Sequence, residues 1–438
     1  MSFRVGVNPT LPTEVFRDGV GGYRHYRIPS LVTTPSNVVL ALAEGRKQKN
    51  DHGWVDIVLR RSFDGGETWS PMSVVHTESN ATHRVTIGNP TPLVDAPEVV
   101  LLLNRENAEI LLTRSVDDGA TWSPPRQISW SRPPEWQWLA VGPPAALRTR
   151  AGRWVVPADG FAGHSRFYSA TSIFSFVLLS DDRGETWRSG SLLDGGNECQ
   201  AAERADGSLV LNMRSRDAVR LLSFSHDGGD TWSPPTQGMP GIQDGNCQGS
   251  MIAARGGRIL LATSVGHGRT ELRLHASADG GGWARVGTLE PGKAGYSALA
   301  ALPPEGVVRH VVNADGGSAA VDDGDGDSGA EGERVGCLFE ASRLPEGDAA
   351  PRRGEDGVLL LTTFVAPPPA VVPFEYDGVV QSSVRPRARV STDYQGPAVG
   401  PYVEVDEENV EAIMAEWEAK GGAKAESRPA RMNWADEM

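Results

Sequence analysis

Cysteine is scarce in this sequence, and long hydrophobic runs are missing. The three cysteines, Cys199, Cys247 and Cys337, lie far apart and show neither a CxxC pair nor the histidine spacing of a zinc site. We therefore expect buried, small apolar residues and neither a disulfide framework nor a metal centre. No run of about 18 apolar residues occurs, and the start of the chain lacks the apolar core of a secretion signal, so we expect no transmembrane segment and a cytoplasmic location.

Positive charge is also in short supply. The chain holds 42 Lys and Arg against 56 Asp and Glu, a formal net charge of −14. This balance argues against nucleic acid or an anionic membrane as a partner. It leaves a small anionic ligand open, because a local cluster of arginines can reverse the field inside a cleft. The composition does not indicate an oligomeric state.

Tryptophan and glycine are plentiful, and they recur in a repeated octet. The pattern S-x-D-x-G-x-T-W occurs at Ser62–Trp69, Ser115–Trp122, Ser180–Trp187 and Ser225–Trp232, and a weaker copy without Thr spans Ser277–Trp283. Each copy follows a β-rich run such as DIVLRRS or FSFVLLS. Asp near Gly is turn chemistry, so each octet is interpreted as a hairpin turn whose Trp packs on the core. The copies recur about every 45–65 residues, a period typical of propeller blades.

Two further strands precede each octet, which gives six units of about four antiparallel strands. The sequence therefore predicts an all-β fold, a six-bladed β-propeller over residues 1–375. The sixth unit has no octet and contains an acidic, glycine-rich insertion, 313–334, which we expect to be loosely ordered. An EF-hand calcium loop is disfavoured there, because Ser328 occupies the turn-glycine position and Arg334 that of the bidentate Glu.

The C-terminal extension, 376–438, begins rich in proline and is predicted to hold a short amphipathic helix followed by a tail. Within 406–422 the apolar residues Val410, Ile413, Met414 and Trp417 share one helical face, and two glycines stop the helix. Docking on the propeller and binding of a partner are both open interpretations of this face.

The strand order of a four-stranded meander separates the octets from a second set of polar residues. The start of the first strand and the end of the second lie on one face of the disc, so the octet turns lie on the opposite face. The octet aspartates are therefore interpreted as structural. The other face collects Arg27, Arg46, Asp51, Asn89, Glu198, Arg214, Arg269, Tyr296 and Glu340.

This set suits chemistry on an acidic sugar. Arginines that converge on one point bind a carboxylate, because the guanidinium is planar, bidentate and always charged. Asp51 suits a proton donor, and Glu340 suits a group that holds an arginine in place. A sugar that carries its own carboxylate would repel a carboxylate nucleophile, whereas the neutral Tyr296, deprotonated by Glu198, avoids that repulsion.

At these residues the sequence resembles the exo-α-sialidase (neuraminidase) family, most closely its cytosolic-type animal enzymes. The resemblance covers about residues 15–375 and rests on YRIP at Tyr26–Pro29, the octets (Asp boxes in that family), Gly88-Asn89-Pro90, Glu198-Cys199-Gln200, Leu211–Arg214, Tyr296-Ser297 and Gly336–Glu340. Asp boxes alone are weakly specific, because non-enzymatic propellers also carry them. The ordered set of charged positions is the more specific signal.

The resemblance implies a retaining exo-α-sialidase that hydrolyses terminal sialic acids from glycoconjugates through a covalent tyrosyl intermediate, without a cofactor. Asp51 is implied as the acid/base, Tyr296 as the nucleophile and Glu198 as its general base. The implied carboxylate-binding triad is Arg27, Arg214 and Arg269, with Arg273 as the alternative third member. The implied supporting residues are Glu340 beside Arg27, Glu44 behind Arg46, and Arg46 and Asn89 on the sugar substituents.

The chain departs from the animal enzymes at Asp159 and Phe161, where those enzymes carry two tyrosines. A preference for the deaminated sugar acid Kdn over N-acetylneuraminate is therefore one alternative, and a trans-sialidase is another. A catalytically inactive propeller that binds sialic acid is a third. Such a binder needs the arginines but not the Tyr296–Glu198 pair, so the full set favours an enzyme.

Overall fold

The computed structural model describes residues 7–162, 172–217, 219–238, 244–304, 309–312, 318–321, 333–342 and 357–366. The second of the chain's two units, 373–432, lies wholly outside the described residues. The helix predicted within 406–422 and the whole extension 376–438 lie outside them too. None of the helices in the described part of the chain has the length and apolar character needed to cross a bilayer.

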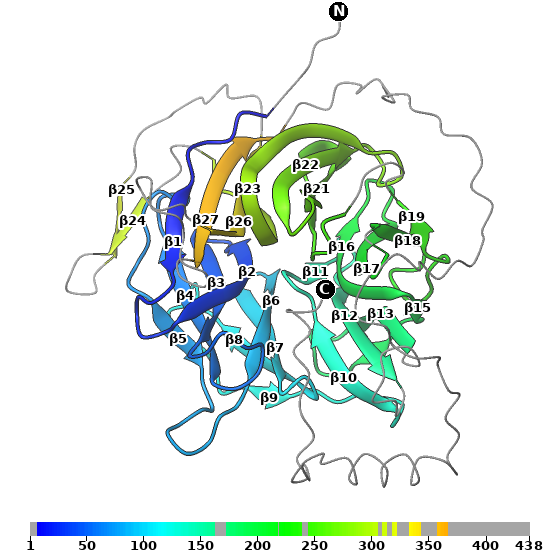
Figure 1. Cartoon of the computed structure of the whole chain (residues 1–438), viewed down its shortest axis with the longest axis horizontal. Coiled ribbons are helices and arrows are strands. Elements are labelled where there is room, and N and C mark those ends of the chain that lie inside the picture. Colours follow the sequence, from blue (N-terminus) through cyan, green and yellow to red (C-terminus); the bar gives the residue numbers. More distant parts are fainter. Residues whose placement is uncertain are drawn as a thin grey trace, which may run out of the picture. The chain divides into compact units, whose positions relative to one another are not determined.

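The described residues form antiparallel β-sheets, with a three-residue 3-10 turn at Arg255–Gly257. The first sheet contains β2 (His25–Thr33), β3 (Val39–Arg46), β4 (Val55–Ser62) and β5 (Ser73–His76). The second contains β6 (Ile87–Asp95), β7 (Glu98–Arg105), β8 (Glu109–Ser115) and β9 (Arg126–Gln127). Figure 1 shows these sheets and those that follow arranged around a common centre in chain order, as in a propeller.

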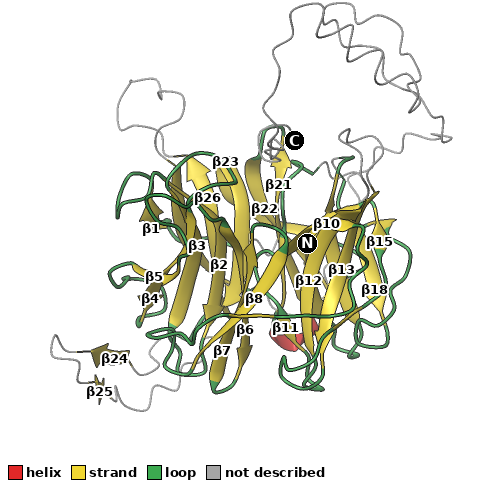
Figure 2. Ribbon diagram, turned by 90° about the horizontal axis from the view of Figure 1, so that it is seen from below, coloured by secondary structure: helices red, strands yellow, loops and turns green. Residues whose placement is uncertain are grey.

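The next two sheets repeat the same four-strand path. The third runs through β10 (Trp136–Val141), β12 (Trp154–Ala162), β13 (Ser172–Ser180) and β14 (Arg188–Ser189), with the short β11 (Leu147–Arg148) on β12 and β15 (Leu193–Asp194) on β13. The fourth contains β16 (Gly196–Glu203), β17 (Leu209–Ser215), β18 (Leu221–Ser225) and β19 (Thr236–Gln237). Seen from the side, the long strands of all these sheets run along the central axis (Figure 2).

Seven of the remaining strands form a single sheet, so the prediction of six separate blades is wrong. Its order is β1 (Thr13–Arg17), β27 (Gly357–Val365), β26 (Arg334–Ser342), β23 (Ala284–Ala301), β22 (Thr270–Ser277), β21 (Ile259–Gly266) and β20 (Ser250–Ala253). β23 is continuous over 18 residues: it pairs with β22 up to Lys293 and with β26 from Ala294. Pro291-Gly292 favours a loop, but the chain stays extended there, and no break separates the two halves.

The insertion predicted as loosely ordered lies partly in the described residues. β24 (Arg309–Val312) and β25 (Ser318–Val321) pair as a two-stranded ribbon. Of the predicted insertion 313–334, only 318–321 and the final two residues are described, so the prediction for the rest lies outside the described residues.

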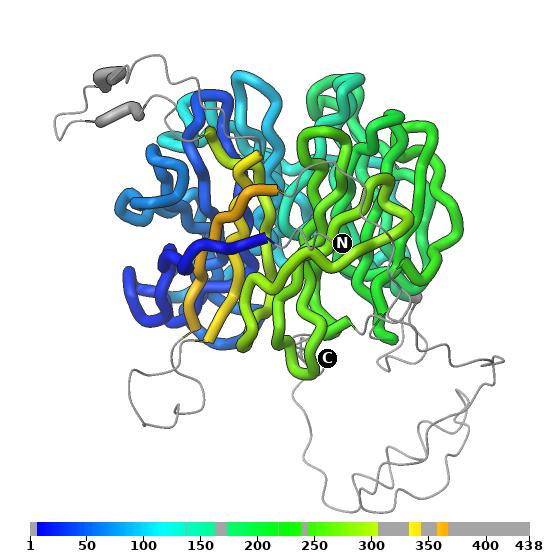
Figure 3. Tube along the Cα trace, turned by 90° about the horizontal axis from the view of Figure 1, so that it is seen from above, coloured from blue at the N-terminus to red at the C-terminus, as the bar shows by residue number. Residues whose placement is uncertain are grey.

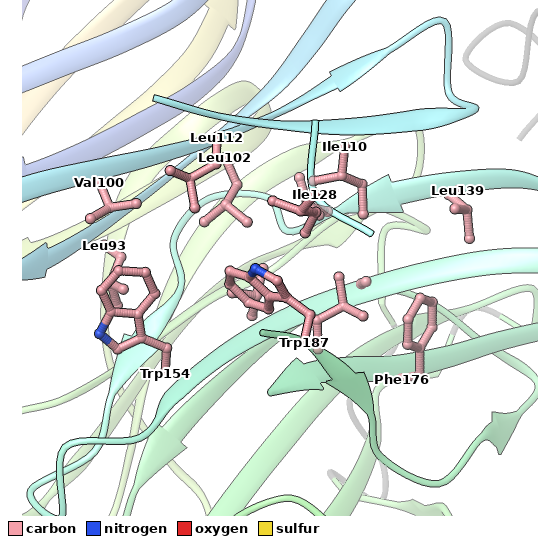
Figure 4. Close-up of a cluster of buried hydrophobic side chains, with 14 of the residues drawn as sticks. Leu93, Val100, Leu102, Ile110, Leu112, Ile128, Leu139, Trp154, Phe176 and Trp187 are labelled. Carbon is pink, nitrogen blue, oxygen red and sulfur yellow. The ribbon is translucent and has the colours of Figure 1, made fainter. Parts of the chain in front are cut away.

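The core fills the space between neighbouring sheets. In the cluster drawn in Figure 4, Leu102 and Leu112 of one sheet face Phe176 and Trp187 of the next. Trp154 is fully buried in this cluster and still donates its indole N–H to Asp95 Oδ2 over 3.0 Å. Every residue of β3, VLALAEGR, is buried. The strand is therefore covered on both faces, which fits the apolar run at its start.

The octets lie at the strand ends opposite to the predicted site residues. In the first sheet Arg46 pairs with Val55, whereas Val39 pairs with Ser62, where the octet begins. The seven residue steps from Val39 to Arg46 span about 24 Å at the rise of a β-strand. The octet aspartates are therefore remote from Arg46, as the meander geometry predicts.

Candidate active site

Four strands, β2, β6, β16 and β23, each interrupt their pairing with a neighbouring strand at one point. The register shifts between Arg27 and Ser30, Gly88 and Thr91, Gly196 and Cys199, and Ala294 and Ser297. A bulge bends a strand and re-aims its side chains. Arg27 stands at the edge of the first bulge, and Asn89, Glu198 and Tyr296 lie inside the other three. The backbone is left-handed within two of them, with φ of 54° at Ile28 and 50° at Asn89.

The bulges border one pocket. Eight of the residues singled out from the sequence line it: Arg27, Glu44, Arg46, Asp51, Asn89, Glu198, Arg214 and Tyr296. They come from four different sheets, so the pocket lies where the sheets converge. Glu340 and Arg269 are not part of its lining but contact residues that are.

Tyr296 and Glu198 form a hydrogen-bonded pair in the lining of the pocket. The Tyr296 hydroxyl donates a short hydrogen bond to Glu198 Oε1. Arg214 Nη1 donates to Glu198 Oε2 over 2.9 Å and to the tyrosine oxygen over 3.4 Å. Burial, followed by the charge of Glu198, raises the pKa of Tyr296 well above its usual value, although nearby arginines act in the opposite direction. The phenol is therefore neutral at rest, with its proton directed at a carboxylate.

Asp51 lies in the loop between β3 and β4 and faces two arginines. Its Oδ1 accepts hydrogen bonds from Arg46 Nη1 over 2.5 Å and from Arg27 Nη1 over 3.3 Å. Glu44 Oε2 in turn holds Arg46 through Nε at 2.8 Å and Nη2 at 2.5 Å. The other oxygen of Glu44 accepts the backbone N–H of Asn89 over 2.8 Å. Glu44 thus supports Arg46 and the second bulge together.

Glu340 ties Arg27 to the strand that carries Tyr296. Its Oε1 accepts the Arg27 Nε–H and the Ile28 backbone N–H, each over 3.1 Å. Its Oε2 accepts the backbone N–H of Tyr296 over 3.3 Å. Burial works to raise the pKa of Glu340, but the charge of Arg27 and the Ile28 hydrogen bond outweigh it and hold this pKa below its usual value.

Arg269, not Arg273, is the arginine beside Tyr296. The Arg269 guanidinium lies 5.4 Å from the centre of the Tyr296 ring, and Arg27 lies 5.1 Å from it. Arg273 pairs instead with Glu271 on the same strand, over 2.6 Å. The backbone at Arg269 is left-handed, with φ of 59°, at the turn between β21 and β22. This turn carries the side chain toward the pocket.

Two arginine nitrogens near the pocket lack acceptors. Nη2 of Arg214 and Nη2 of Arg269 are buried and have no hydrogen-bond partner among the described residues. A buried donor without an acceptor costs free energy, more so when it is charged. Both arginines lie beside Tyr296, which favours an anionic ligand that would supply the missing acceptors.

Asp159 and Phe161, predicted to affect specificity, do not line the pocket but touch residues that do. Asp159 Oδ2 accepts a hydrogen bond from Asn197 Nδ2 over 2.7 Å. Phe161 stacks on Trp138, with ring centres 5.7 Å apart and an interplanar angle of 10°. Both Asn197 and Trp138 line the pocket. Asp159 and Phe161 therefore contact the lining of the pocket without being part of it.

Sequence reasoning missed Asn197, Trp138 and Asn246. Asn246 Oδ1 accepts the Nε–H of Arg214 over 3.1 Å and so orients that arginine. Asn197 directly precedes Glu198, but the bulge that holds both residues depends on the pairing of β16 with β17 and has no signal in the sequence. Trp138 lies within β10, WQWLAV, and Asn246 lies in the loop before β20, in DGNCQGS, and neither segment has a local pattern that marks a site residue. Within the described ranges, no group of three or more His, Cys, Asp or Glu side chains is arranged to hold a metal ion.

Several known proteins that are similar to this chain in sequence are sialidases. Residues 38–306 match the family described as BNR repeat-like domain. A sialidase of Bacteroides fragilis is 28% identical over 64% of this chain and 58% of its own length. Human Sialidase-4 is 31% identical over 52% of this chain and 54% of its own length. The chain thus spans a little over half the length of these two curated relatives.

The fold is also that of solved sialidases. The structure of the Hadza microbial sialidase Hz136 covers 75% of this chain and 66% of its own, with a TM-score of 0.61 and 24% sequence identity. At this identity the likeness concerns the fold.

Proposed function

The chain belongs to the exo-α-sialidase family, and from this premise we propose that it is a retaining exo-α-sialidase that hydrolyses terminal sialic acids from glycoconjugates. The observation that carries the proposal is the contact between the Tyr296 hydroxyl and Glu198 beside two arginines with free Nη2 atoms. A neutral phenol facing a carboxylate base is the kind of nucleophile that an anionic sugar requires.

The arginines bind the carboxylate of the sugar. Arg214 and Arg269 each offer a buried Nη2 donor, and a carboxylate supplies an acceptor to both. Arg27 is held by Glu340 through Nε, so its Nη1, on the Asp51 side, remains directed at the pocket. A carboxylate bound to these arginines would bring the anomeric carbon, which bears it, close to the Tyr296 oxygen.

The first chemical step forms a bond between the Tyr296 oxygen and the anomeric carbon. The phenolic proton passes to Glu198 Oε1 as that bond forms, and Asp51 protonates the glycosidic oxygen as its bond to the anomeric carbon breaks. Arg214 contacts both Glu198 and the tyrosine oxygen, so it stabilises the negative charge shared between them. The aglycone leaves as an alcohol.

The second step reverses the roles. Asp51, now a carboxylate, takes a proton from a water molecule whose oxygen attacks the anomeric carbon on the face that the aglycone has left. The bond from the sugar to Tyr296 breaks, and Glu198 returns the proton to the phenolate. Two inversions at one carbon give net retention.

A preference for Kdn is the second candidate, favoured by the polar Asn197–Asp159 pair beside the pocket. Kdn carries a hydroxyl where N-acetylneuraminate carries an acylamino group, and a polar wall suits a hydroxyl better than a methyl group. Comparison of kcat/KM for fluorogenic glycosides of the two sugars tests this candidate. A strong preference for N-acetylneuraminate would remove it.

Turnover of a fluorogenic sialoside tests the main proposal against an inactive binding propeller. We expect hydrolysis, together with competitive inhibition by a 2,3-unsaturated sialic acid analogue. A binding propeller would retain the analogue without releasing the fluorophore. That result would contradict the proposal.

A further inference from the structure

Asp159 is a buried carboxyl near the pocket that the proposed reaction does not use. It is 0% exposed, in a strand that is otherwise apolar up to Gly160. Its Oδ2 accepts the hydrogen bond from Asn197, and its Oδ1 has no partner in the part of the chain that the structure describes. Burying a carboxyl with a single hydrogen bond costs free energy that an apolar residue would not. Its presence in the core therefore requires an explanation.

The groups around Asp159 favour its neutral form. Burial, and then the charge of Glu198, raises the pKa of Asp159 well above its usual value, while Arg214 acts against this. The Cys199 thiol also interacts electrostatically with Asp159, and burial raises the pKa of that thiol as well. A neutral Asp159 places no second negative charge beside Glu198. Its remaining interaction is the hydrogen bond to Asn197.

Asn197 faces the pocket. Its backbone carbonyl accepts the Ser175 hydroxyl over 2.6 Å, which fixes the main chain inside the bulge. Its Nδ2 is directed at Asp159, and the two polar atoms of a planar amide point in different directions. The side chain therefore presents Oδ1, an acceptor, to the pocket that it lines.

We propose that Asp159 is a positioning residue that fixes the Asn197 amide so that its Oδ1 accepts a hydrogen bond from a hydroxyl or N–H group of the sugar. The inference rests on the proposed function, because it needs an acidic sugar in the pocket. It adds a requirement on the substrate: the substituent at Asn197 is a hydrogen-bond donor. Asp159 acts through Asn197 and not through the base, Glu198.

Four variants test this proposal: Asp159→Leu, Asp159→Asn, Asn197→Ala and the double variant Asp159→Leu with Asn197→Ala. For each, KM and kcat are measured on a fluorogenic sialoside, and the Kd of an unsaturated sialic acid analogue is measured by calorimetry. We expect Asp159→Leu and Asn197→Ala each to raise KM and Kd about tenfold, the effect of one lost hydrogen bond, while kcat changes less than about threefold. Asp159→Asn keeps an acceptor for Asn197 Nδ2 and should restore both constants to within about twofold of the wild type.

The double variant gives the sharpest result, because it should bind no more weakly than Asn197→Ala alone. Additive losses, an unchanged KM and Kd in Asn197→Ala, or a fall in kcat at constant KM would each overturn the proposal. Asp159→Asn and Asn197→Ala are the deciding variants if Asp159→Leu does not fold. Calorimetry needs no catalysis, so an inactive wild type would contradict the proposed function while the binding test still decides this inference.

Discussion

Arg214 contacts both members of the Tyr296–Glu198 pair, and in the proposed mechanism this shared contact would allow a buried phenol to act as the nucleophile. A tyrosinate alone would be disfavoured by burial, which is the largest influence on its pKa. Proton transfer to Glu198 keeps the total charge of the pair unchanged while the bond to the sugar forms. Arg214 donates to both groups, so its stabilisation persists wherever the proton lies.

Arg269 should contribute mainly to substrate binding. Arg269→Lys replaces a bidentate guanidinium by a point charge on a flexible stem, and we expect KM to rise about 10- to 100-fold, the cost of a charge-assisted hydrogen bond, with a smaller effect on kcat. Arg273→Lys is the matched control, because Arg273 pairs with Glu271 and should leave KM nearly unchanged. Steady-state kinetics of both variants decide the assignment. A larger effect in Arg273→Lys would reverse it.

The sequence could predict residues that carry a chemical signal of their own. Arg27 in YRIP, Asp51 after a strand end and Tyr296 at a strand start all depart from the apolar pattern around them. Asn197 and Trp138 carry no such signal, because their place at the pocket depends on cross-strand contacts. Trp138 lies opposite Phe161 in the register of β10 and β12, and neither strand alone specifies that register.

Among the elements, each octet is a self-contained turn held by its Asp and Ser. In the third copy, Ser180 donates to Asp182 Oδ1 over 2.9 Å and accepts the Gly184 N–H over 2.7 Å. Thr186 donates through its backbone to Asp182 over 2.9 Å and through its hydroxyl over 2.6 Å. The Trp187 side chain then closes the adjoining core cluster. The sequence predicts this element well because the hydrogen bonds that hold the turn lie within eight residues.

Asp182 should matter for stability and not for catalysis. The hydrogen bonds from Thr186 lower the pKa of Asp182 to about 2, so its contribution is present above its unfolded pKa of about 4 and is lost as pH falls through about 2. We expect Asp182→Ala to lower Tm at pH 7, the difference from wild type to shrink between pH 4 and pH 2, and kcat/KM to stay within about twofold.

Glu67→Ala is the control for Asp182→Ala. Glu67 is exposed and holds the position in the first octet that Glu185 holds in the third. Its Tm should match the wild type at every pH. A loss of activity in Asp182→Ala at a temperature where the variant remains folded would contradict the structural role of the octets.

β23 is the element that the sequence could not predict. A proline followed by glycine is among the strongest local signals for a turn, and here the strand continues through it. Pairing of Lys293 with Thr270 and of Ala294 with Ala341 holds the segment extended from both sides. These partners lie far away in the sequence, and tertiary pairing outweighs the local preference.

In the molecule as a whole, the N-terminal strand completes the last sheet. β1 pairs with β27 in a register that joins Thr13 to Leu361, and Figure 3 shows the blue strand lying against the orange one. The pairing covers the edge of β27, which would otherwise offer unpaired backbone groups. The sequence gives no sign of this contact, because the partners are separated by almost the whole described chain.

Phe16 should contribute strongly to the stability that the pairing of β1 with β27 provides. It is 2% exposed, and its ring centre lies 5.2 Å from that of Tyr26, next to Arg27. We expect Phe16→Ala to reduce the free energy of unfolding by about 3–5 kcal/mol in urea titrations. Leu11→Ala, at a side chain that is 92% exposed, should change it little. Equal effects of the two substitutions would contradict a closing role for β1.

Trapping of the covalent intermediate tests the central claim most directly. A 2,3-difluorinated sialic acid slows both chemical steps and leaves the sugar bound to the nucleophile, so mass spectrometry of digested protein identifies the residue. We expect the added mass on the peptide that contains Tyr296, no adduct in Tyr296→Phe, and a normal adduct in the control Tyr23→Phe, whose hydroxyl bonds Asp56 outside the pocket lining. An adduct on Asp51 or Glu198, or undiminished sialoside turnover by Tyr296→Phe, would contradict the account.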